Sequence, residues 1–156
     1  MPDIVAVKTY LAGKGIEVWE YDQPTPTAET AAAAVGCQPA QIAKTLLFVV
    51  GGQPLVVVAC GDMRVKSSLL KRGTGLSGKV KLPQAEEVEA MTGYAPGGVC
   101  PFLLPPDLPV YLDHSLKRFD QVYAAAGNAA SAVPIAADVL ENLCRGGWVK
   151  VCEPIG

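Results

Sequence analysis

The sequence predicts an α+β fold: a mixed, largely antiparallel β-sheet or barrel flanked by helices. Two apolar runs of strand length, Leu46–Val50 and Leu55–Cys60, stand on either side of Gly51–Pro54, a stretch typical of a hairpin turn. Strand-like and helix-like segments interleave along the chain, yet several are joined by connections of hairpin length. This pattern favours the α+β layout over a doubly wound parallel sheet.

Hydrophobic periodicity and turn residues predict the other elements. Helical spacing predicts helices over 4–11, 28–35, 65–72, 83–91 and 134–144, and one helical turn over 39–43. Short or alternating apolar segments predict strands over 16–21, 110–112, 122–125 and 148–152, the first ended by Pro24 and Pro26. Thr27 is the expected N-cap of the second helix, but Thr30 stands where a capping box needs Glu or Gln. Turn residues predict an irregular segment over 93–102 and a turn over 113–117.

The length and composition predict one globular domain over residues 1–156. Half of the residues are apolar and 18 % are charged, which excludes a disordered chain. The net charge of −2 gives no general attraction to DNA or RNA, so any phosphate contact must come from a local basic cluster. Arg64, Lys66, Lys71 and Arg72 form such a cluster, which is either a solvated helix face or a phosphate contact.

The cysteine and histidine content argues against a metal or a cofactor. The five cysteines show no Cys-x-x-Cys spacing, and His114 is the single histidine. A Ser-His-Asp triad has no support either, because His114 follows Asp113 in the expected turn and reads as a surface residue. With neither a signal pattern nor an apolar run of membrane-spanning length, we expect a cytoplasmic protein that does not enter a membrane.

Lys44 is the first candidate for a functional side chain. It opens the apolar run that ends at Val50, directly after the helical turn that begins at Pro39. A lysine that enters a core must snorkel, pair with an acceptor or face a cleft, since burying the ammonium alone is costly. The residue is therefore either a snorkelling lysine at the strand edge or a cation at the mouth of a pocket.

The segment Gly97–Gly98–Val99–Cys100–Pro101 is the second candidate. Its two glycines permit positive φ and close approach of the backbone, and free N–H groups in such a turn can face an anion or a developing oxyanion. An ordinary turn is the alternative. Cys100 needs a nearby cation or base to serve as a nucleophile, so a residue that lines a pocket is the more economical interpretation.

Four segments together resemble the YbaK/ProX family of aminoacyl-tRNA editing proteins. They are Ala43–Phe48, Thr92–Phe102, Leu108–Asp113 and Val122–Gly127, and they occur in the family's order over nearly the whole chain. The resemblance implies the family's fold, a mixed barrel-like sheet with flanking helices. It also implies hydrolysis of the ester that joins a wrong amino acid to its tRNA, with a mischarged tRNA acceptor end as partner and an aminoacyl-tRNA synthetase as a further one.

The resemblance also implies roles for individual residues. Lys44 corresponds to the family's lysine and is the expected catalytic residue, acting by orienting substrate and stabilising charge. Thr45 corresponds to the second residue of the family's Lys-Thr pair, and Gly97, Gly98, Cys100 and Pro101 correspond to its Gly-x-x-x-Pro loop. Tyr21 matches a tyrosine of the Cys-tRNA deacylase branch. These residues and Asp113 form the expected substrate-binding set.

One segment departs from the family pattern. Where the Cys-tRNA deacylase branch has a serine, a basic pair and an acid, this chain has the alanine-rich stretch 124–132. Specificity for cysteine therefore does not carry over, and we expect a small amino acid such as Ala, Cys or Ser. The alternative function is a non-catalytic module that binds aminoacyl-tRNA or a nucleotide-like ligand.

Overall fold

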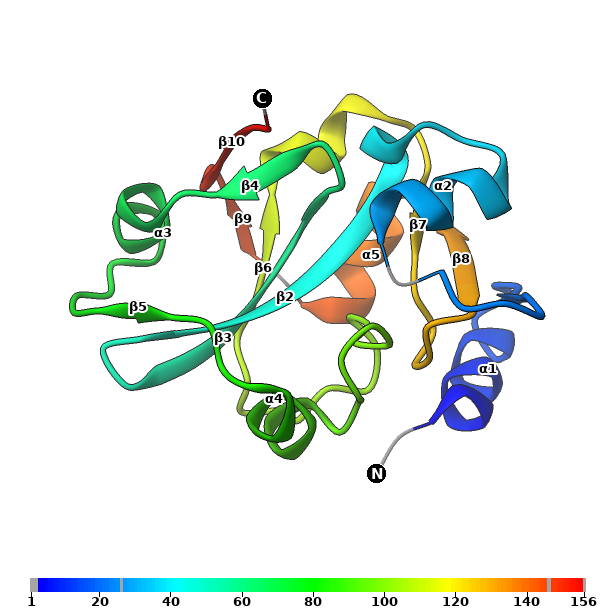
Figure 1. Ribbon diagram of the computed structural model, residues 1–156, viewed down its shortest axis with the longest axis horizontal. Helices are drawn as coiled ribbons and strands as arrows, with labels where there is room; N and C mark the ends of the chain where they lie inside the picture. The colour runs from blue at the N-terminus through cyan, green and yellow to red at the C-terminus, as the bar shows by residue number, and fades with distance from the viewer. Residues whose placement is uncertain (1–2, 26, 146, 156) are drawn as a thin grey trace.

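The computed structural model describes residues 3–25, 27–145 and 147–155, and a mixed β-sheet forms its centre (Figure 1). The strands are β1 (Trp19–Glu20), β2 (Ile42–Val50), β3 (Gln53–Cys60), β4 (Met63–Val65), β5 (Val80–Lys81), β6 (Val110–Asp113), β7 (Val122–Ala124), β8 (Ser131–Ile135), β9 (Gly147–Val149) and β10 (Cys152–Pro154). The helices are α1 (Ile4–Ala12), α2 (Ala28–Val35), α3 (Ser67–Thr74), α4 (Ala85–Thr92) and α5 (Ala137–Cys144), with 3₁₀ turns η1 (Pro39–Gln41) and η2 (His114–Arg118).

The sheet runs in the order β1-β8-β7-β2-β3-β6-β9, with β5 paired to β2 beside this path. The pairs β1–β8, β7–β8, β2–β3 and β2–β5 are antiparallel, whereas β2–β7, β3–β6 and β6–β9 are parallel. A separate antiparallel pair joins β4 to β10. This architecture confirms the predicted mixed α+β fold.

The hairpin β2–β3 is the centre of the sheet and forms as the sequence predicts. Gly51 and Gly52 have φ values of +55° and +84°, the left-handed conformation that a two-residue hairpin turn requires. Each side chain from Leu55 to Cys60 is fully buried. A continuous apolar run suits this strand because both faces of the sheet are covered, so alternate side chains enter two different cores.

The two cores lie on opposite faces of β3. Val56, Val58 and Cys60 pack in the larger core, which includes residues of α1, α5 and the segment that follows α4. Leu55, Val57 and Ala59 pack in the smaller core, which α3 and the chain around β9 and β10 cover. The sheet is therefore enclosed on both faces, and access to β2 has to come from its edge.

That edge of β2 is only partly covered. β7 pairs with Ile42 and Ala43 at one end of β2, and β5 pairs with Val49 and Val50 at the other. Figure 1 shows β7 beside the upper right end of β2 and β5 beside its lower left end. Among the described strands none pairs with residues 44–48 on this edge, so the sheet has a gap there.

Several element boundaries differ from those that the sequence predicts. α3 begins at Ser67 because residues 63–65 form β4, which pairs with β10. α5 begins at Ala137 because Pro134 lies in β8, opposite Tyr123. Proline is tolerated in this strand because β1 pairs with β8 only at Ser131 and Ala132, which leaves the edge open at Pro134.

The predicted strands at the two ends of the chain are also shorter than expected. The strand over 16–21 is reduced to β1, and the turn residue Pro26 lies outside the described residues. The strand over 148–152 is divided into β9 and β10, because Val151 between them makes other hydrogen bonds. Its N–H donates to the Asp113 carboxylate, and its carbonyl accepts from the main-chain N–H of Lys66. Thr27 caps α2 as predicted, and Thr30 completes a capping box despite being neither Glu nor Gln.

Candidate active site

A cavity of about 370 Å³ lies at the gap beside β2. One wall is the edge of β2 from Ile42 to Leu47, and the others come from the start of α2, from α4, from the glycine loop and from the turn between β7 and β8. The residues that line it are Thr25, Thr27, Ala28, Ala31, Ile42, Ala43, Lys44, Thr45, Leu46, Leu47, Leu82, Pro83, Val88, Pro96, Gly97, Val99, Tyr123, Ala124, Ala125, Asn128, Ala129, Ser131 and Ala132. The lining is mostly apolar, with a single ammonium and a few hydroxyl and amide groups.

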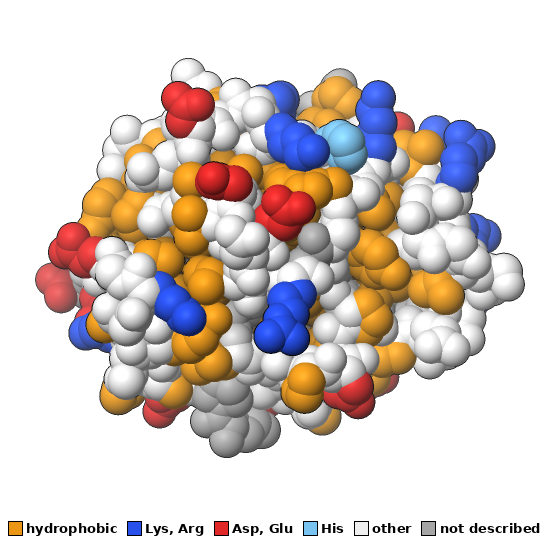
Figure 2. Space-filling model, turned by 180° about the vertical axis from the view of Figure 1, so that it is seen from behind, with side chains coloured by type: hydrophobic (Ala, Val, Ile, Leu, Met, Phe, Trp, Pro, Cys, Tyr) orange, Lys and Arg blue, Asp and Glu red, His pale blue; other side chains and the backbone are white. Residues whose placement is uncertain are grey.

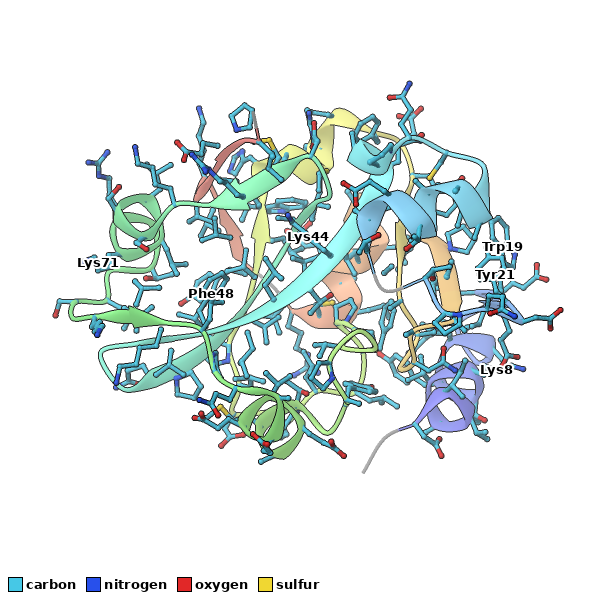
Figure 3. All side chains as sticks on the ribbon, in the orientation of Figure 1. Lys8, Trp19, Tyr21, Lys44, Phe48 and Lys71 are labelled. Carbon is cyan, nitrogen blue, oxygen red and sulfur yellow. The ribbon has the colours of Figure 1, made fainter. Side chains whose placement is uncertain are left out.

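Lys44 is half-buried in this wall, and its ammonium is held by the chain. The Lys44 Nζ donates to the main-chain carbonyl of Met63, the first residue of β4. By the alternation of side chains along β2, Lys44 shares a face with Phe48; Figure 3 labels both. Lys44 thus contributes to the cavity wall, and its ammonium is hydrogen-bonded to the Met63 carbonyl.

The turn that presents the Met63 carbonyl is fixed by an ion pair. Two guanidinium nitrogens of Arg118 donate to the two carboxylate oxygens of Asp62 at 3.0 and 2.6 Å. Hydrogen bonding from Arg118 lowers the pKa of the Asp62 carboxyl below its ordinary value, and the charge of Lys44 contributes in the same direction. A negative charge therefore lies near the Lys44 ammonium and helps to keep it in place.

The Thr45 hydroxyl is the one buried side-chain oxygen or nitrogen in the described residues that has no hydrogen-bond partner. Thr45 follows Lys44 along β2 and also lines the cavity. Buried polar groups are nearly always paired, because an unpaired one costs about 1–3 kcal/mol. The Thr45 hydroxyl is therefore available as a donor or acceptor in the cavity wall.

Gly97 and Gly98 bring the opposite wall close to the turn between β7 and β8. Gly97 lines the cavity at φ +89°, a conformation that favours glycine. A Cβ on Gly98 would lie 2.7 Å from Asn128 Cα, so the loop can contact that turn only without a side chain. Gly98 itself is buried behind Gly97 and does not line the cavity.

Comparison with known proteins identifies the family. The aminoacyl-tRNA editing domain matches residues 22–143. The chain belongs to the aminoacyl-tRNA editing domain family. This result confirms the predicted resemblance, and with it the expected class of enzyme, an aminoacyl-tRNA deacylase.

Individual relatives span most of this editing domain. The uncharacterised protein YwhH of Bacillus subtilis is 36 % identical over 139 residues, which is 88 % of this chain and 87 % of that protein. EbsC of Enterococcus faecalis, named as a candidate Cys-tRNA(Pro)/Cys-tRNA(Cys) deacylase, is 27 % identical over 80 % of this chain and 76 % of its own. The proline–tRNA ligase of Lysinibacillus sphaericus is 32 % identical over 64 % of this chain, but that match is only 17 % of the ligase.

A solved structure shares the fold over the whole domain. The crystal structure of a candidate trans-editing enzyme for prolyl-tRNA synthetase superposes with a TM-score of 0.87 and 31 % identity, and the match covers 98 % of both chains. This agreement confirms the predicted family fold.

Tyr21 and Pro101 lie outside the cavity wall of the editing domain. Figure 3 shows Tyr21 beside Trp19 at the β1 end of the molecule, well away from Lys44. Burial, with smaller contributions from Cys37 and Tyr123, raises the pKa of the Tyr21 hydroxyl. Pro101 is buried, and its carbonyl accepts from the Cys144 thiol at 3.4 Å. Neither residue is among those that line the cavity.

Cys100 is a core residue. Its side chain is fully buried in the larger core and does not line the cavity. The thiol faces the Phe102 carbonyl at 3.8 Å, and burial raises its pKa to about 11. Among the residues of this loop, Gly97 and Val99 line the cavity, whereas Cys100 packs in the core.

Asp113 is also buried away from the cavity, where its carboxylate organises the backbone. One oxygen accepts from the Ser115 N–H at 3.0 Å and caps η2, and the other accepts from the Val151 N–H at 2.9 Å. Two main-chain donors occupy the two carboxylate oxygens. The structure therefore gives Asp113 a structural position and does not bring it to Lys44 and Gly97.

Sequence reasoning did not identify several lining residues. Thr25 lies in a loop without a motif, and Tyr123 and Asn128 lie in segments that the sequence singled out without naming these residues. A signal that could have located this turn is Ser131, the serine within the alanine-rich stretch: its hydroxyl accepts from the Ala126 N–H and donates to the Asn128 carbonyl. These bonds close a turn between two paired strands and present Asn128 to the cavity.

The face of the molecule that Figure 2 shows, opposite to the one in Figure 1, carries charges of both signs. Figure 2 shows His114, the single histidine, at this surface among lysine or arginine side chains, with acidic side chains nearby. The exposed position of His114 confirms the sequence prediction of a surface histidine.

In the basic cluster, Arg64 and Lys66 pair with Glu153 at 2.8 and 3.9 Å. None of the helices in residues 3–25, 27–145 and 147–155 is long and apolar enough to cross a membrane.

Proposed function

We propose that this editing domain acts in trans as a hydrolase that removes a small, wrongly attached amino acid from the 3′ end of tRNA. The observation that carries the proposal is the cavity itself. It brings together an anchored lysine, a buried hydroxyl without a partner, and a glycine that leaves main-chain groups accessible. The similarity to EbsC, a candidate Cys-tRNA deacylase, and to the candidate trans-editing enzyme supports the same reaction.

The reaction requires little more than positioning and charge. An aminoacyl ester is already activated, so water can attack its carbonyl carbon while the bond to the ribose oxygen breaks, which yields free amino acid and tRNA. Lys44 would stabilise the negative charge that develops in this step or hold the terminal phosphate, and the main chain at Gly97 would face the acyl group. Cys100 is not the nucleophile in this scheme, because its thiol is buried and its pKa is about 11.

The walls favour a small side chain. Leu47, Val88, Val99 and Ala124 supply apolar surface, and the volume of about 370 Å³ has to accommodate part of the terminal nucleotide as well. Alanine, cysteine and serine are the candidate amino acids. The similarity to part of proline–tRNA ligases favours tRNA(Pro) as carrier and a prolyl-tRNA synthetase as the enzyme whose errors are corrected.

A deacylation panel tests the proposal. Alanyl-, cysteinyl- and seryl-tRNA(Pro) are incubated with the wild-type protein, with Lys44→Ala and with Lys14→Ala, a matched exposed lysine outside the cavity. We expect hydrolysis of at least one substrate, a loss of about 100-fold in kcat/KM for Lys44→Ala, and no change for Lys14→Ala. Hydrolysis at the uncatalysed rate, or full activity of Lys44→Ala, would refute the proposal, and tight binding without hydrolysis would favour the non-catalytic module.

A further inference from the structure

The gap in the sheet exposes main-chain groups of β2 to the cavity. β7 pairs with β2 only at Ile42 and Ala43, and β5 pairs only at Val49 and Val50. Thr45, Leu46 and Leu47, which lie between these pairings, line the cavity. A strand edge without a partner presents a row of N–H and C=O groups that can pair with an added group.

The hydrogen-bond alternation shows which groups these are. In an antiparallel ladder, alternate residues direct both N–H and C=O toward the same neighbour. The Gly61 N–H donates to the Ile42 carbonyl at 2.8 Å on the β3 side. The main-chain N–H and C=O groups of Ile42, Lys44 and Leu46 therefore point toward β3. The intervening residues, Thr45 and Leu47, therefore direct their N–H and C=O groups into the gap.

The pairing of β2 with β5, on the edge that carries the gap, gives the same result independently. The Gly51 N–H donates to the Lys79 carbonyl at 3.0 Å, beside the pairing of Val49 with Lys81. Residues 49 and 51 thus face β5, and by the same two-residue period Leu47 and Thr45 face the space where β5 no longer extends. The Thr45 hydroxyl, buried and without a partner, belongs to one of these two residues.

The charges in the lining limit what can bind there. No aspartate or glutamate is among the lining residues in the described part of the chain, while the Lys44 ammonium is bonded to Met63. An amine donor in the cavity therefore finds no carboxylate among these residues, and its acceptors are main-chain carbonyls, hydroxyl groups and the Asn128 amide. Burying such a donor is costly unless acceptors of this kind receive it.

We propose that the open edge of β2, the main-chain groups of Thr45 and Leu47 with the Thr45 hydroxyl, is the subsite for the α-amino group of the substrate. The carbonyls and the hydroxyl accept from the amino group, and the neighbouring N–H groups are then available to the acyl carbonyl. The subsite rests on the proposed function for its ligand, an α-aminoacyl group on tRNA. It makes the domain selective for acyl groups with a free α-amino group, in addition to the selection for a small side chain by the cavity walls.

A binding series on non-hydrolysable tRNA tests this subsite. The tRNA carries a 3′-terminal 3′-amino-3′-deoxyadenosine acylated through an amide with an alanyl, a lactyl or a propionyl group, so that only the α-substituent changes. We expect the alanyl form to bind about 10-fold more tightly than the propionyl form, with the lactyl form between them, because a charge-assisted hydrogen bond is replaced first by a neutral one and then by none. Equal dissociation constants, or no measurable binding of any of the three, would overturn the inference.

Variants of Thr45 supply the second measurement. Thr45→Val keeps the shape of the side chain but removes the hydroxyl, and Thr45→Ser keeps the hydroxyl. We expect Thr45→Val to reduce the preference for alanyl over propionyl about 5-fold and Thr45→Ser to retain it. Because the hydroxyl has no partner in the free protein, Thr45→Val should not lower the melting temperature. A lower melting temperature with an unchanged preference would show that the hydroxyl is structural.

The two proposals fail in different ways. If the alanyl amide is preferred but no aminoacyl ester is hydrolysed, the amino subsite stands and the hydrolase is refuted. If esters are hydrolysed but the α-amino group has no effect on binding, the hydrolase stands and the subsite is refuted.

Discussion

The ammonium of Lys44 donates a hydrogen bond to the main-chain carbonyl of Met63, where β4 begins. Met63 directly follows the turn after β3, and Asp62 in that turn is held by two nitrogens of the Arg118 guanidinium. Arg118 also donates to the Ser115 carbonyl at 3.0 Å, so it is fixed on η2. Arg118, far from Lys44 in the sequence, thus holds the turn next to the carbonyl that accepts from the Lys44 ammonium.

Arg118→Ala should lower activity through Lys44. Without the guanidinium the turn at Asp62 is free to shift, and a small displacement of a catalytic group is costly in rate. We expect kcat/KM for the substrate that the panel identifies to fall about 10-fold, mostly in kcat. In a Lys44→Ala background, Arg118→Ala should have no further effect, since residues that act through one another are not additive. An equal loss in both backgrounds would show that Arg118 acts elsewhere.

The same ion pair predicts a dependence of stability on pH. The pKa of Asp62 is lowered in the folded state, so its contribution is present above the unfolded-state value of about 4 and is lost as the pH falls through the lower folded-state value. Both side chains are more than a third exposed, which limits the contribution to about 0.5–1 kcal/mol after screening by solvent. Urea unfolding should show Asp62→Asn less stable than wild type at pH 7, with the difference shrinking progressively as the pH is lowered toward 2. A constant difference would contradict the assignment.

Gly98→Ala should disturb the cavity through the turn between β7 and β8. The new Cβ would lie 2.7 Å from the Asn128 Cα and 3.0 Å from the Asn128 main-chain nitrogen, so the main chain has to move. We expect a loss of about 1–3 kcal/mol in the free energy of unfolding and reduced deacylation. Gly147→Ala is the matched control, because a Cβ there meets nothing within 4 Å. Calorimetry and the deacylation assay check both variants, and an unchanged Gly98→Ala protein would count against this packing.

Cys100→Ala should retain deacylase activity. The thiol is fully buried, its pKa is about 11, and it does not line the cavity. We expect kcat/KM within about 3-fold of wild type, together with a loss of about 1 kcal/mol in stability from the vacated volume. Assays of Cys100→Ala and Lys44→Ala side by side give the comparison. Inactivation of a well-folded Cys100→Ala protein would restore the thiol to the chemistry.

Local pattern was sufficient for the centre of the fold. The hairpin from Leu46 to Cys60 is specified by two apolar runs and a turn that permits positive φ, all within neighbouring residues. The position of Lys44 at the entry to this hairpin was equally evident. The order of the family motifs predicted the enzyme class, because each motif is a short segment that can be recognised without its partners in space.

Tertiary structure alone decided how these parts become a site. The gap beside β2 exists because β7 and β5, distant in sequence, pair with opposite ends of that strand, and register between distant strands is not encoded in local periodicity. The same holds for Asp113 and Cys100, whose residue types suit a pocket but whose surroundings place them in the core. The sequence by itself determined which residues could do chemistry; packing determined that Lys44, Thr45 and Gly97 share one cavity, because only long-range contacts bring separate segments together.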